Sequence, residues 1–157
     1  MISLIAAIGK NRELGLGNEL CFRIPEDMRY FKDTTMGHKV LMGRKTWESL
    51  PAGGLKGREN IVVSRHEVPG ADLVIHDLAG FLQENAESEE EIFVIGGGMV
   101  YFESLPYAAR LYLTEVDAEC EADAWFPEFD KSKYNREVIK KGQHDELGYT
   151  FVKYVKK

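Results

Sequence analysis

Short, continuous apolar stretches alternate with helical patterns along most of this chain, and this alternation limits the folds open to it. Four of these stretches lie at Met1–Ile8, Val40–Met42, Asn60–Val63 and Ile92–Ile95. A strand that is apolar on both sides must be covered on both sides, as in a parallel sheet flanked by helices. The sequence therefore predicts an α/β fold with a mostly parallel central sheet.

The remaining segments complete this pattern. Further strands are expected at Asp72–Ile75 and Leu111–Val116, and an antiparallel pair at 134–142 and 149–155. Helices are expected from Pro25 to near Gly37, over Gly43–Leu50, around Leu78–Leu82, and from the Gly96–Gly98 run to about Leu105. Residues 9–24 are expected to form a loop long enough to be functional, and the acidic run Glu87–Glu91 a solvated connector.

Length and charge narrow the function classes. A chain of 157 residues is expected to form one domain, residues 1–157. The net charge of -6 argues against nucleic acid or an anionic membrane as the main partner. No apolar run approaches 18 residues and no basic, then apolar, leader is present, so we expect a cytoplasmic protein. The two cysteines and four histidines lack metal-ligand spacing, and Cys21 is interpreted as a reduced thiol without chemistry of its own.

Asp27 is the most informative single residue. In the predicted helix it shares an apolar face with Tyr30 and Phe31, whereas Glu26 belongs to a charged stripe. A carboxylate on an apolar face needs a cationic or hydrogen-bonding partner, and no Lys or Arg lies at helical spacing to provide one. That partner is either a ligand or, in the structural alternative, the backbone N–H groups of the first helical turn.

Three strand ends have the character of an anion site. Gly96, Gly97 and Gly98 follow a strand and open a helix, where absent Cβ atoms let a pyrophosphate approach the backbone; a simple tight turn is the alternative. Cations follow two other strands, at Arg44-Lys45-Thr46 and Ser64-Arg65. Cations gain nothing from the dipole at a helix N-terminus, so a bound anion would explain their presence there. A phosphate on an adenosine ribose fits this role, which favours NADP over NAD. The alternative is that these are ordinary solvated cations.

Seven stretches, taken in order, resemble dihydrofolate reductase of the bacterial chromosomal type over nearly the full chain. They are Ile2–Ala7, Leu14–Asn18, Pro25–Lys32, Val40–Ser49, Gly57–Arg58, Val94–Tyr101 and Leu111–Asp117. The resemblance implies an eight-stranded, mostly parallel sheet with an antiparallel C-terminal edge and about four helices. It also implies NADPH-dependent reduction of 7,8-dihydrofolate to tetrahydrofolate, by hydride transfer to pterin C6 with protonation at N5.

The resemblance further implies roles for individual residues. Asp27 would be the ionised group of the pterin pocket, supported by Thr114, and Arg58 would grip the glutamate carboxylate. The catalytic set would be Asp27, Phe22, Leu20, Tyr101 and Thr114. The substrate set would be Ile5, Ala6, Asp27, Met28, Phe31, Leu50, Leu55, Arg58, Ile95 and Thr114. The cofactor set would be Ala7, Leu14, Gly15, Asn18, Leu20, Gly43, Arg44, Lys45, Thr46, Ser64, Arg65, Ile95, Gly96, Gly97, Gly98, Met99, Val100 and Tyr101, with a cis peptide at Gly96-Gly97 and no metal.

The chain departs from the family pattern in the loop before the first helix and at three other places. The usual Pro-Trp pair is Cys21-Phe22 here, so the ring is kept but the indole N–H donor is lost. Met99 replaces a basic residue, and the segment Pro51–Gly57 carries one extra residue. Ala122 stands where a glycine is frequent, before Asp123, which should bond to the loop near Gly15.

Two other functions compete with the reductase. A related-fold pyrimidine reductase of riboflavin synthesis would share the nucleotide-binding glycines but should lack Asp27 together with Arg58. A non-catalytic NADPH-binding module would leave Asp27 and Thr114 without a task. The family resemblance also implies a monomer that binds antifolates such as trimethoprim or methotrexate, because a diaminopyrimidine would pair with the same carboxylate.

Overall fold

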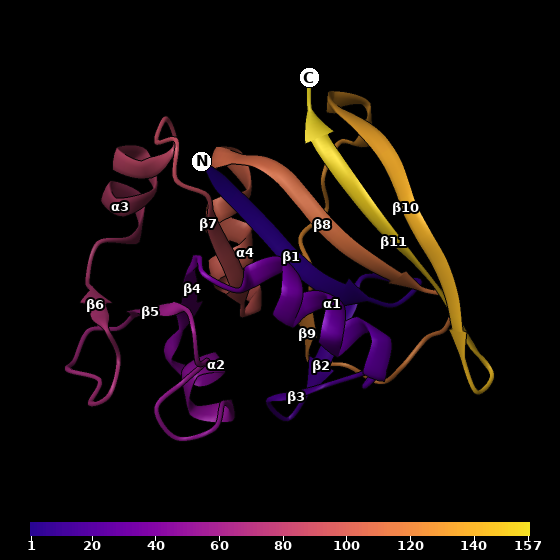
Figure 1. Cartoon of the computed structure of the whole chain (residues 1–157), viewed down its shortest axis with the longest axis horizontal. Coiled ribbons are helices and arrows are strands. Elements are labelled where there is room, and N and C mark those ends of the chain that lie inside the picture. Colours follow the sequence, from indigo (N-terminus) through magenta and orange to yellow (C-terminus); the bar gives the residue numbers. More distant parts are fainter.

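A computed structural model describes all residues from 1 to 157, and its centre is one eight-stranded sheet (Figure 1). The strand order is β10-β11-β8-β1-β7-β4-β5-β6. The strands are β1 (Ile2–Ile8), β4 (Lys39–Gly43), β5 (Glu59–Val63), β6 (Leu73–Ile75), β7 (Ile92–Gly96), β8 (Ala108–Val116), β10 (Tyr134–His144) and β11 (Leu147–Lys156). Six neighbouring strands pair in parallel, and β10 and β11 add an antiparallel edge. The predicted α/β class and sheet are confirmed.

Four helices flank the sheet, as predicted. They are α1 (Pro25–Thr35), α2 (Arg44–Ser49), α3 (Leu78–Asn85) and α4 (Gly98–Ser104). Two short 3₁₀ turns follow, η1 (Leu105–Tyr107) and η2 (Lys131–Lys133). The helix α1 begins with Pro25 at its first position, where a missing N–H leaves no helical hydrogen bond unmade.

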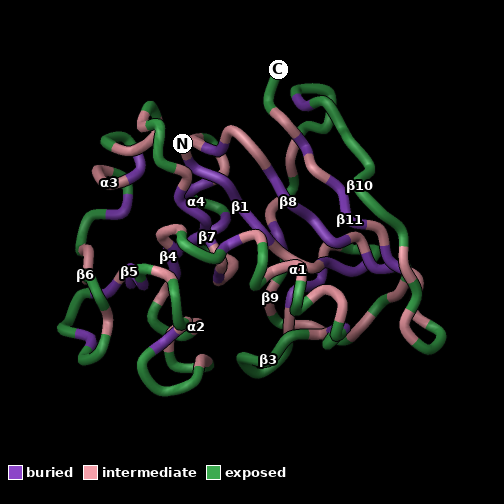
Figure 2. The backbone as a smooth tube through the Cα atoms, viewed as in Figure 1, coloured by how far each residue is buried: buried purple, intermediate pink, exposed green.

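Alternation along the central strands places two helices on each side of the sheet. Successive side chains of a strand point to opposite faces. The face with Leu4 and Val94 packs against α3 and α4, and the face with Ile5 and Phe93 packs against α1 and α2. Figure 2 shows buried backbone concentrated in β1, β7 and β8, with exposed segments at the rim. The central strands are thus covered on both sides, and their carboxyl ends point to one edge.

The predicted 9–24 loop contains secondary structure that the sequence analysis missed. The strands β2 (Glu13–Leu16) and β3 (Glu19–Leu20) pair with each other, and β2 also pairs with β9 (Ala124–Trp125). These three short strands form a second, small sheet. Strands of two to four residues are too short to show an apolar period, and the pairing of β2 with β9 joins segments about 110 residues apart.

Three interpretations from the sequence are wrong in whole or in part. Cys21 is not a reduced thiol but forms a disulfide with Cys120. The acidic connector is exposed at Glu87, Glu89 and Glu90, as expected, but the Glu91 side chain is only 13% exposed and accepts a 2.6 Å hydrogen bond from Ser3 Oγ. Glu26 does not lie on a free charged stripe, because Tyr149 and Lys140 donate to its carboxylate. In all three cases the partner is distant in sequence, so spacing along the chain gives no sign of it.

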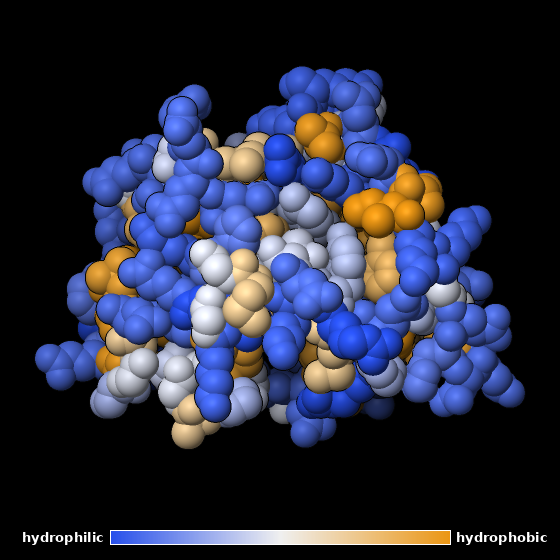
Figure 3. Space-filling model, in the orientation of Figure 1, coloured by the Kyte–Doolittle hydropathy of each residue, from blue (hydrophilic) through white to orange (hydrophobic).

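The outer edge of the sheet carries a hydrophobic patch. Figure 3 shows a mostly hydrophilic surface with such a patch over β10, the strand that carries the exposed Val138 and Ile139. The pairing with β11 is irregular between Val138 and Lys140, and lysines follow at 140 and 141. Irregular pairing and lysines are common protections of an edge strand against pairing with another chain.

None of the helices has the length and apolar composition that a membrane-spanning helix requires.

Candidate active site

Asp27 and Thr114 meet where α1 crosses the central strands. Thr114 lies on β8, in register with Ala7 of the parallel neighbour β1. Its Oγ1 donates a 2.5 Å hydrogen bond to Asp27 Oδ1. Burial raises the pKa of the Asp27 carboxyl above its ordinary value, and the bond from Thr114 opposes this shift. No cation contributes to the pKa shift, so the structure provides this carboxylate with one hydroxyl donor and no counter-charge.

An apolar cluster adjoins this carboxylate on the same face of the sheet. Buried Ile5 belongs to a core cluster against which several predicted substrate residues pack while remaining partly exposed. These are Phe31 from α1, Leu50 and Leu55 after α2, and Ile95 from β7. The structure therefore brings together an acid from one helix and apolar side chains from four separate segments.

Two predicted substrate residues do not join this cluster. The Met28 side chain is 49% exposed, and Ala6 packs against the core on the other face of the sheet. For Ala6 the reason is the strand itself, because it follows Ile5 and successive residues face opposite sides. Met28 follows Asp27 in α1, and its exposure leaves it without a packing partner in the core.

Arg58 lies beyond the apolar cluster, directly after Gly57, whose φ of 75° is the left-handed conformation that glycine tolerates best. Its Nη1 donates to Thr35 Oγ1 at 3.2 Å and its Nε to the Lys56 carbonyl at 2.9 Å. Both acceptors are neutral oxygens. Burial lowers the pKa of the guanidinium, which stays charged at any physiological pH. A carboxylate ligand would supply the charged partner that the chain does not.

The glycines expected at the cofactor site line two adjacent strand ends. Gly96 of β7 lies next to Met42 of β4, and the Gly96-Gly97 peptide bond is cis, as the family resemblance implied. A Cβ on Gly96 would come within 3.1 Å of Thr46 Oγ1, and one on Gly43 within 3.3 Å of Val100 Cγ2. No side chain caps α2 or α4, so the N–H groups at both helix starts lack side-chain acceptors.

The two predicted cation clusters lie side by side. Gly43 at the end of β4 pairs with Val63 at the end of β5, so Arg44 and Ser64 follow neighbouring strand ends. Both Arg44 and Arg65 are exposed; Arg44 forms only a surface ion pair with Glu48, at 3.6 Å. Lys45 is exposed as well, and its carbonyl accepts from Asn18 Nδ2 at 2.9 Å, which ties the 9–24 loop to this edge.

Sequence reasoning missed His76 at the same edge. The residue follows Ile75 of β6, which pairs with Val63 of β5, and its Nδ1 lies 2.6 Å from the Ser64 carbonyl. The contact fixes the backbone where the predicted phosphate-binding residues begin. A signal was available, because polar residues at the ends of neighbouring parallel strands meet at one edge.

The loop over this edge is held at Gly15 and Gly17. Asp123 donates its N–H to the Gly15 carbonyl at 2.9 Å, and its Oδ2 accepts from the Gly17 N–H at 3.1 Å. The predicted bond between Asp123 and the loop near Gly15 is confirmed. Buried Tyr101 fixes the opposite side, since its hydroxyl donates to the Ile5 carbonyl at 2.7 Å.

Four other predicted site residues differ widely in exposure. Leu20 is 53% exposed and Met99 72%, so neither is tied to the core. Phe22 is 7% exposed and packs in a separate cluster with Ile24, Val116 and Phe151, although the family resemblance places it in the catalytic set. Leu14 belongs to the main core.

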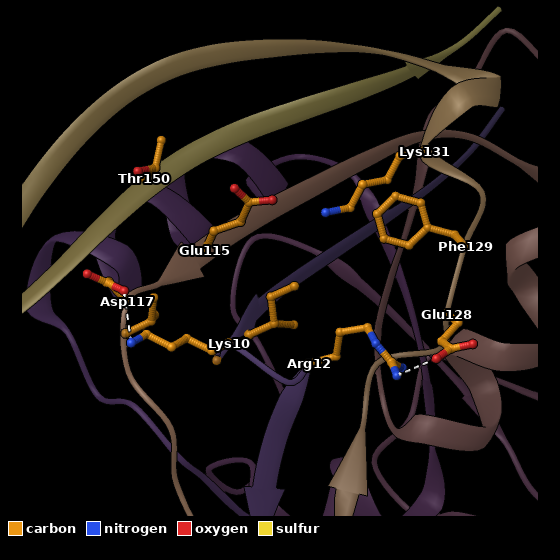
Figure 4. A pocket seen from close by; sticks show the side chains of 11 residues that line it. Lys10, Arg12, Glu115, Asp117, Glu128, Phe129, Lys131 and Thr150 are labelled. Atoms are coloured by element: carbon orange, nitrogen blue, oxygen red, sulfur yellow. Dashed lines mark hydrogen bonds and ion pairs between the residues drawn. The ribbon is translucent and has the colours of Figure 1, made fainter.

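An open hollow of about 610 Å³ lies elsewhere, near the ends of β1 and β8 (Figure 4). None of the predicted site residues lines it. Its charges largely neutralise one another: Lys10 lies 3.4 Å from Asp117 and Arg12 lies 3.1 Å from Glu128. No group of three or more His, Cys, Asp or Glu side chains is arranged to hold a metal ion. Of the six charged side chains in the lining only Lys131 lacks an ion pair, so the hollow holds no cluster of unpaired charges.

Comparison with known proteins agrees with this arrangement. The dihydrofolate reductase family model matches residues 1–156. The chain is 42% identical to a dihydrofolate reductase of Neisseria gonorrhoeae, covering 99% of this chain and 98% of the relative. It is 41% identical to a dihydrofolate reductase of Bacillus subtilis (strain 168), over 100% of this chain and 95% of the relative. It is 45% identical to one of Mycobacterium tuberculosis, over 74% of this chain and 72% of the relative. The chain belongs to the dihydrofolate reductase family of enzymes.

Proposed function

We propose that this protein reduces 7,8-dihydrofolate to 5,6,7,8-tetrahydrofolate with NADPH. The observation that carries the proposal is the Asp27 carboxylate, partly buried beside an apolar cluster, with Thr114 as its hydrogen-bond donor and no cation to neutralise it. Family membership supports the reaction class and a nicotinamide cofactor. The pterin ring supplies the donors that the carboxylate lacks.

Asp27 orients the pterin and favours its protonation. Its carboxylate accepts hydrogen bonds from the pterin 2-amino group and N3, and its negative charge favours a proton at N5, which comes from water. Thr114 keeps one carboxylate oxygen in place while the other faces the ligand. When bound, the reduced nicotinamide supplies the hydride that pterin C6 accepts. The residues of the chain contribute position, charge and exclusion of water.

The apolar cluster receives the rest of the substrate. Ile5, Phe31 and Ile95 pack against the pterin, and Leu50 and Leu55 against the benzoyl ring. Arg58, whose hydrogen bonds go to neutral oxygens, binds the glutamate carboxylate with the remaining edge of its guanidinium. Met28 and Ala6 are proposed to contribute at the margin, Met28 by folding over the bound ligand.

The residues at the strand ends fit a dinucleotide phosphate. The positions Gly43, Gly96 and Gly97 keep side-chain atoms away from the surface formed by β4 and β7, which lets a pyrophosphate reach backbone N–H groups. Arg44, Lys45 and Arg65 are exposed cations beside it and would bind the phosphate of the adenosine ribose. Those charges support a preference for NADPH over NADH. We propose that the other members of the predicted cofactor set contact the dinucleotide along the same edge or support the residues that do.

We further propose that inhibitors bind at the same site and that the protein is a monomer. A diaminopyrimidine such as trimethoprim, or methotrexate, would present to Asp27 the same pair of donors as a pterin. We propose that the chain works as a single domain and a cytoplasmic monomer, with these small molecules rather than nucleic acid or membranes as its partners.

One experiment tests the function. Protein mixed with NADPH and dihydrofolate should oxidise the cofactor, followed by the loss of nicotinamide absorbance, and Asp27→Asn should remove most of that rate. Asp33→Asn, an exposed acid on the same helix, is the matched control and should keep it. Oxidation with a ribosylamino-pyrimidine but not with dihydrofolate would indicate the riboflavin-type reductase. Binding of NADPH without any turnover would indicate a sensor module.

A further inference from the structure

The disulfide between Cys21 and Cys120 joins two segments that are 99 residues apart in sequence. Cys21 lies in the loop before α1, and Cys120 lies in the loop between β8 and β9. Their Cα atoms are 6.2 Å apart, within the range that a disulfide spans without moving the backbone. These are the only two cysteines of the chain, so each has one possible intramolecular partner.

Cys120 is held on the fixed side of this link. Its N–H donates a 3.0 Å hydrogen bond to Glu13 Oε2, and the other Glu13 oxygen accepts from the Asn11 N–H at 2.7 Å. Glu13 is only 3% exposed, so this carboxylate is a buried anchor for the backbone around Cys120. The backbone that carries the Cys120 sulfur is therefore held in one position.

Cys21 lies between a loosely held segment and a buried one. Before it, Leu20 is 53% exposed and β3 is only two residues long; after it, Phe22 is 7% exposed and packs with Ile24. The Cys21 N–H donates to the Leu14 carbonyl at 3.1 Å. Apart from the disulfide, the loop is tied to the segment 118–125 by the backbone bonds between β2 and β9, by Glu13 and by Asp123. Hydrogen bonds of this kind open locally at small free-energy cost, whereas a covalent bond does not.

Both cysteines are partly exposed, although they also pack against the cluster of Phe22 and Val116. Partial exposure is the condition for exchange with a small thiol or disulfide. In a compartment where thiols are kept reduced, a cysteine pair at such a position is more often a reversible, redox-sensing pair than a structural staple.

We propose that Cys21 and Cys120 form a reversible thiol–disulfide site that controls the opening of the loop over the reaction site. In the oxidised protein the link keeps the segment 15–21 against 118–125; in the reduced protein this segment opens more readily, while Leu14, Phe22 and Ile24 stay packed in the core. Oxidation requires a small-molecule disulfide: one protein thiolate attacks it and releases one small thiol, then the second protein thiolate displaces the other. Two protein thiols lose two electrons and two protons, and the small disulfide becomes two thiols.

The catalytic consequence rests on the proposed function. A loop that covers bound ligands must open for the product to leave, and such opening limits turnover in many enzymes. The oxidised enzyme should therefore turn over more slowly than the reduced enzyme. Control by a covalent bond between the two loops would link folate reduction to the balance of small thiols and disulfides around the protein.

The site itself can be tested without folate or NADPH. Wild-type protein is equilibrated with oxidised glutathione or with dithiothreitol, its free thiols are counted, and amide hydrogen exchange is followed in residues 14–24. We expect no free thiols after oxidation and two after reduction, with exchange in the loop roughly tenfold slower in the oxidised protein. Two thiols that persist under oxidised glutathione, or equal exchange in both states, would overturn the proposal.

Two serine variants provide matched controls. Cys21→Ser and Cys120→Ser each remove the disulfide, so both should exchange at the rate of the reduced wild type in either buffer; redox-dependent exchange in a variant would refute the assignment to this pair. Turnover is measured on the same samples. We expect a several-fold, dithiothreitol-reversible loss in the oxidised wild type and none in the variants. A redox-dependent loop with unchanged turnover would refute the catalytic control, whereas absence of reductase activity in every sample would refute the proposed function and leave the thiol site standing.

Discussion

Thr114 Oγ1 lies 2.5 Å from Asp27 Oδ1, and this hydrogen bond joins β8 to α1 across 87 residues of sequence. It has two consequences. It restrains the carboxylate that we propose to bind the pterin, and it opposes the rise in the pKa of Asp27 that burial causes. The hydroxyl therefore helps to keep the carboxylate ionised in an environment that disfavours charge.

Replacing Thr114 by valine should shift the pH dependence of the enzyme. The isosteric change removes the donor, so the pKa of Asp27 rises further and the acid limb of kcat/KM moves to higher pH. A lost hydrogen bond to a charged group is worth about 1.5–3 kcal/mol, so kcat/KM near neutral pH should fall roughly tenfold or more. Thr114→Ser, which keeps the hydroxyl, is the control and should retain most of the activity. An unchanged profile for the valine variant would show that the bond does not tune Asp27.

Asp27→Asn should separate activity from stability. Turnover near neutral pH should fall roughly a hundredfold or more, while NADPH affinity stays nearly intact because the proposed cofactor residues lie on other strand ends. The folded-state pKa of Asp27 is raised, so its contribution to stability is present at pH below 3.8 and is lost as pH rises through the folded-state value. The variant should thus resist urea better than wild type at neutral pH, and equally at low pH. Near-native turnover across the pH range would falsify the role given to Asp27.

Most of the fold could be predicted because its strands are local apolar patterns with characteristic ends. The run Ile92–Ile95 followed by three glycines predicts a buried strand and a backbone-lined site, whatever the rest of the chain does. The carboxylate Asp27 was found in the same way, as a charge on an apolar helical face. Features of this kind depend on residues within a few positions of one another.

What the sequence did not reveal depends on distant partners. The pairing of β2 with β9, the anchoring of Glu26 by Tyr149 and the disulfide of Cys21 each join segments about 100 residues or more apart. No local pattern encodes such contacts, since each partner has several plausible environments on its own. The ring of Phe22 illustrates the same limit: family resemblance gives it a catalytic role, but its burial against Phe151 follows from tertiary packing.

Removing the positive charges at the ends of β4 and β5 should weaken the preference for NADPH. Arg44→Ala and Arg65→Ala should each reduce the ratio of kcat/KM for NADPH to that for NADH by about tenfold, which corresponds to ~1.4 kcal/mol. Folding should be unaffected, because the surface pair of Arg44 with Glu48 contributes little. Lys141→Ala, an exposed cation on β10, is the control. Steady-state kinetics with both cofactors would refute the assignment if the ratio stays constant.

Phe22→Trp tests whether the missing indole N–H matters. We expect single-turnover hydride transfer to be unchanged if the indole stays packed against the cluster of Ile24 and Phe151, and slightly faster if its N–H reaches the proposed pterin site. The larger ring must fit a site that is 7% exposed, and overpacking of a core typically costs about 1–3 kcal/mol. Stability should therefore fall, as measured by urea unfolding, with Phe22→Leu as a control that lacks both the donor and the ring. If the rate of hydride transfer falls strongly while stability stays normal, the prediction that the indole N–H is tolerated at this position is wrong.

Reduction of the disulfide should lower stability and change the unfolded state. The link closes a loop of about 100 residues in the unfolded chain, and removing such a link typically costs roughly 2–4 kcal/mol. The midpoint of urea unfolding should therefore fall on adding dithiothreitol, and the m value should rise because the unlinked unfolded chain exposes more surface. Cys21→Ser and Cys120→Ser should match the reduced wild type and not respond to dithiothreitol. If reduction released only the loop, the midpoint would stay constant while hydrogen exchange of residues 14–24 still accelerated. The two measurements together therefore distinguish a disulfide that stabilises the whole fold from one that restrains only the loop.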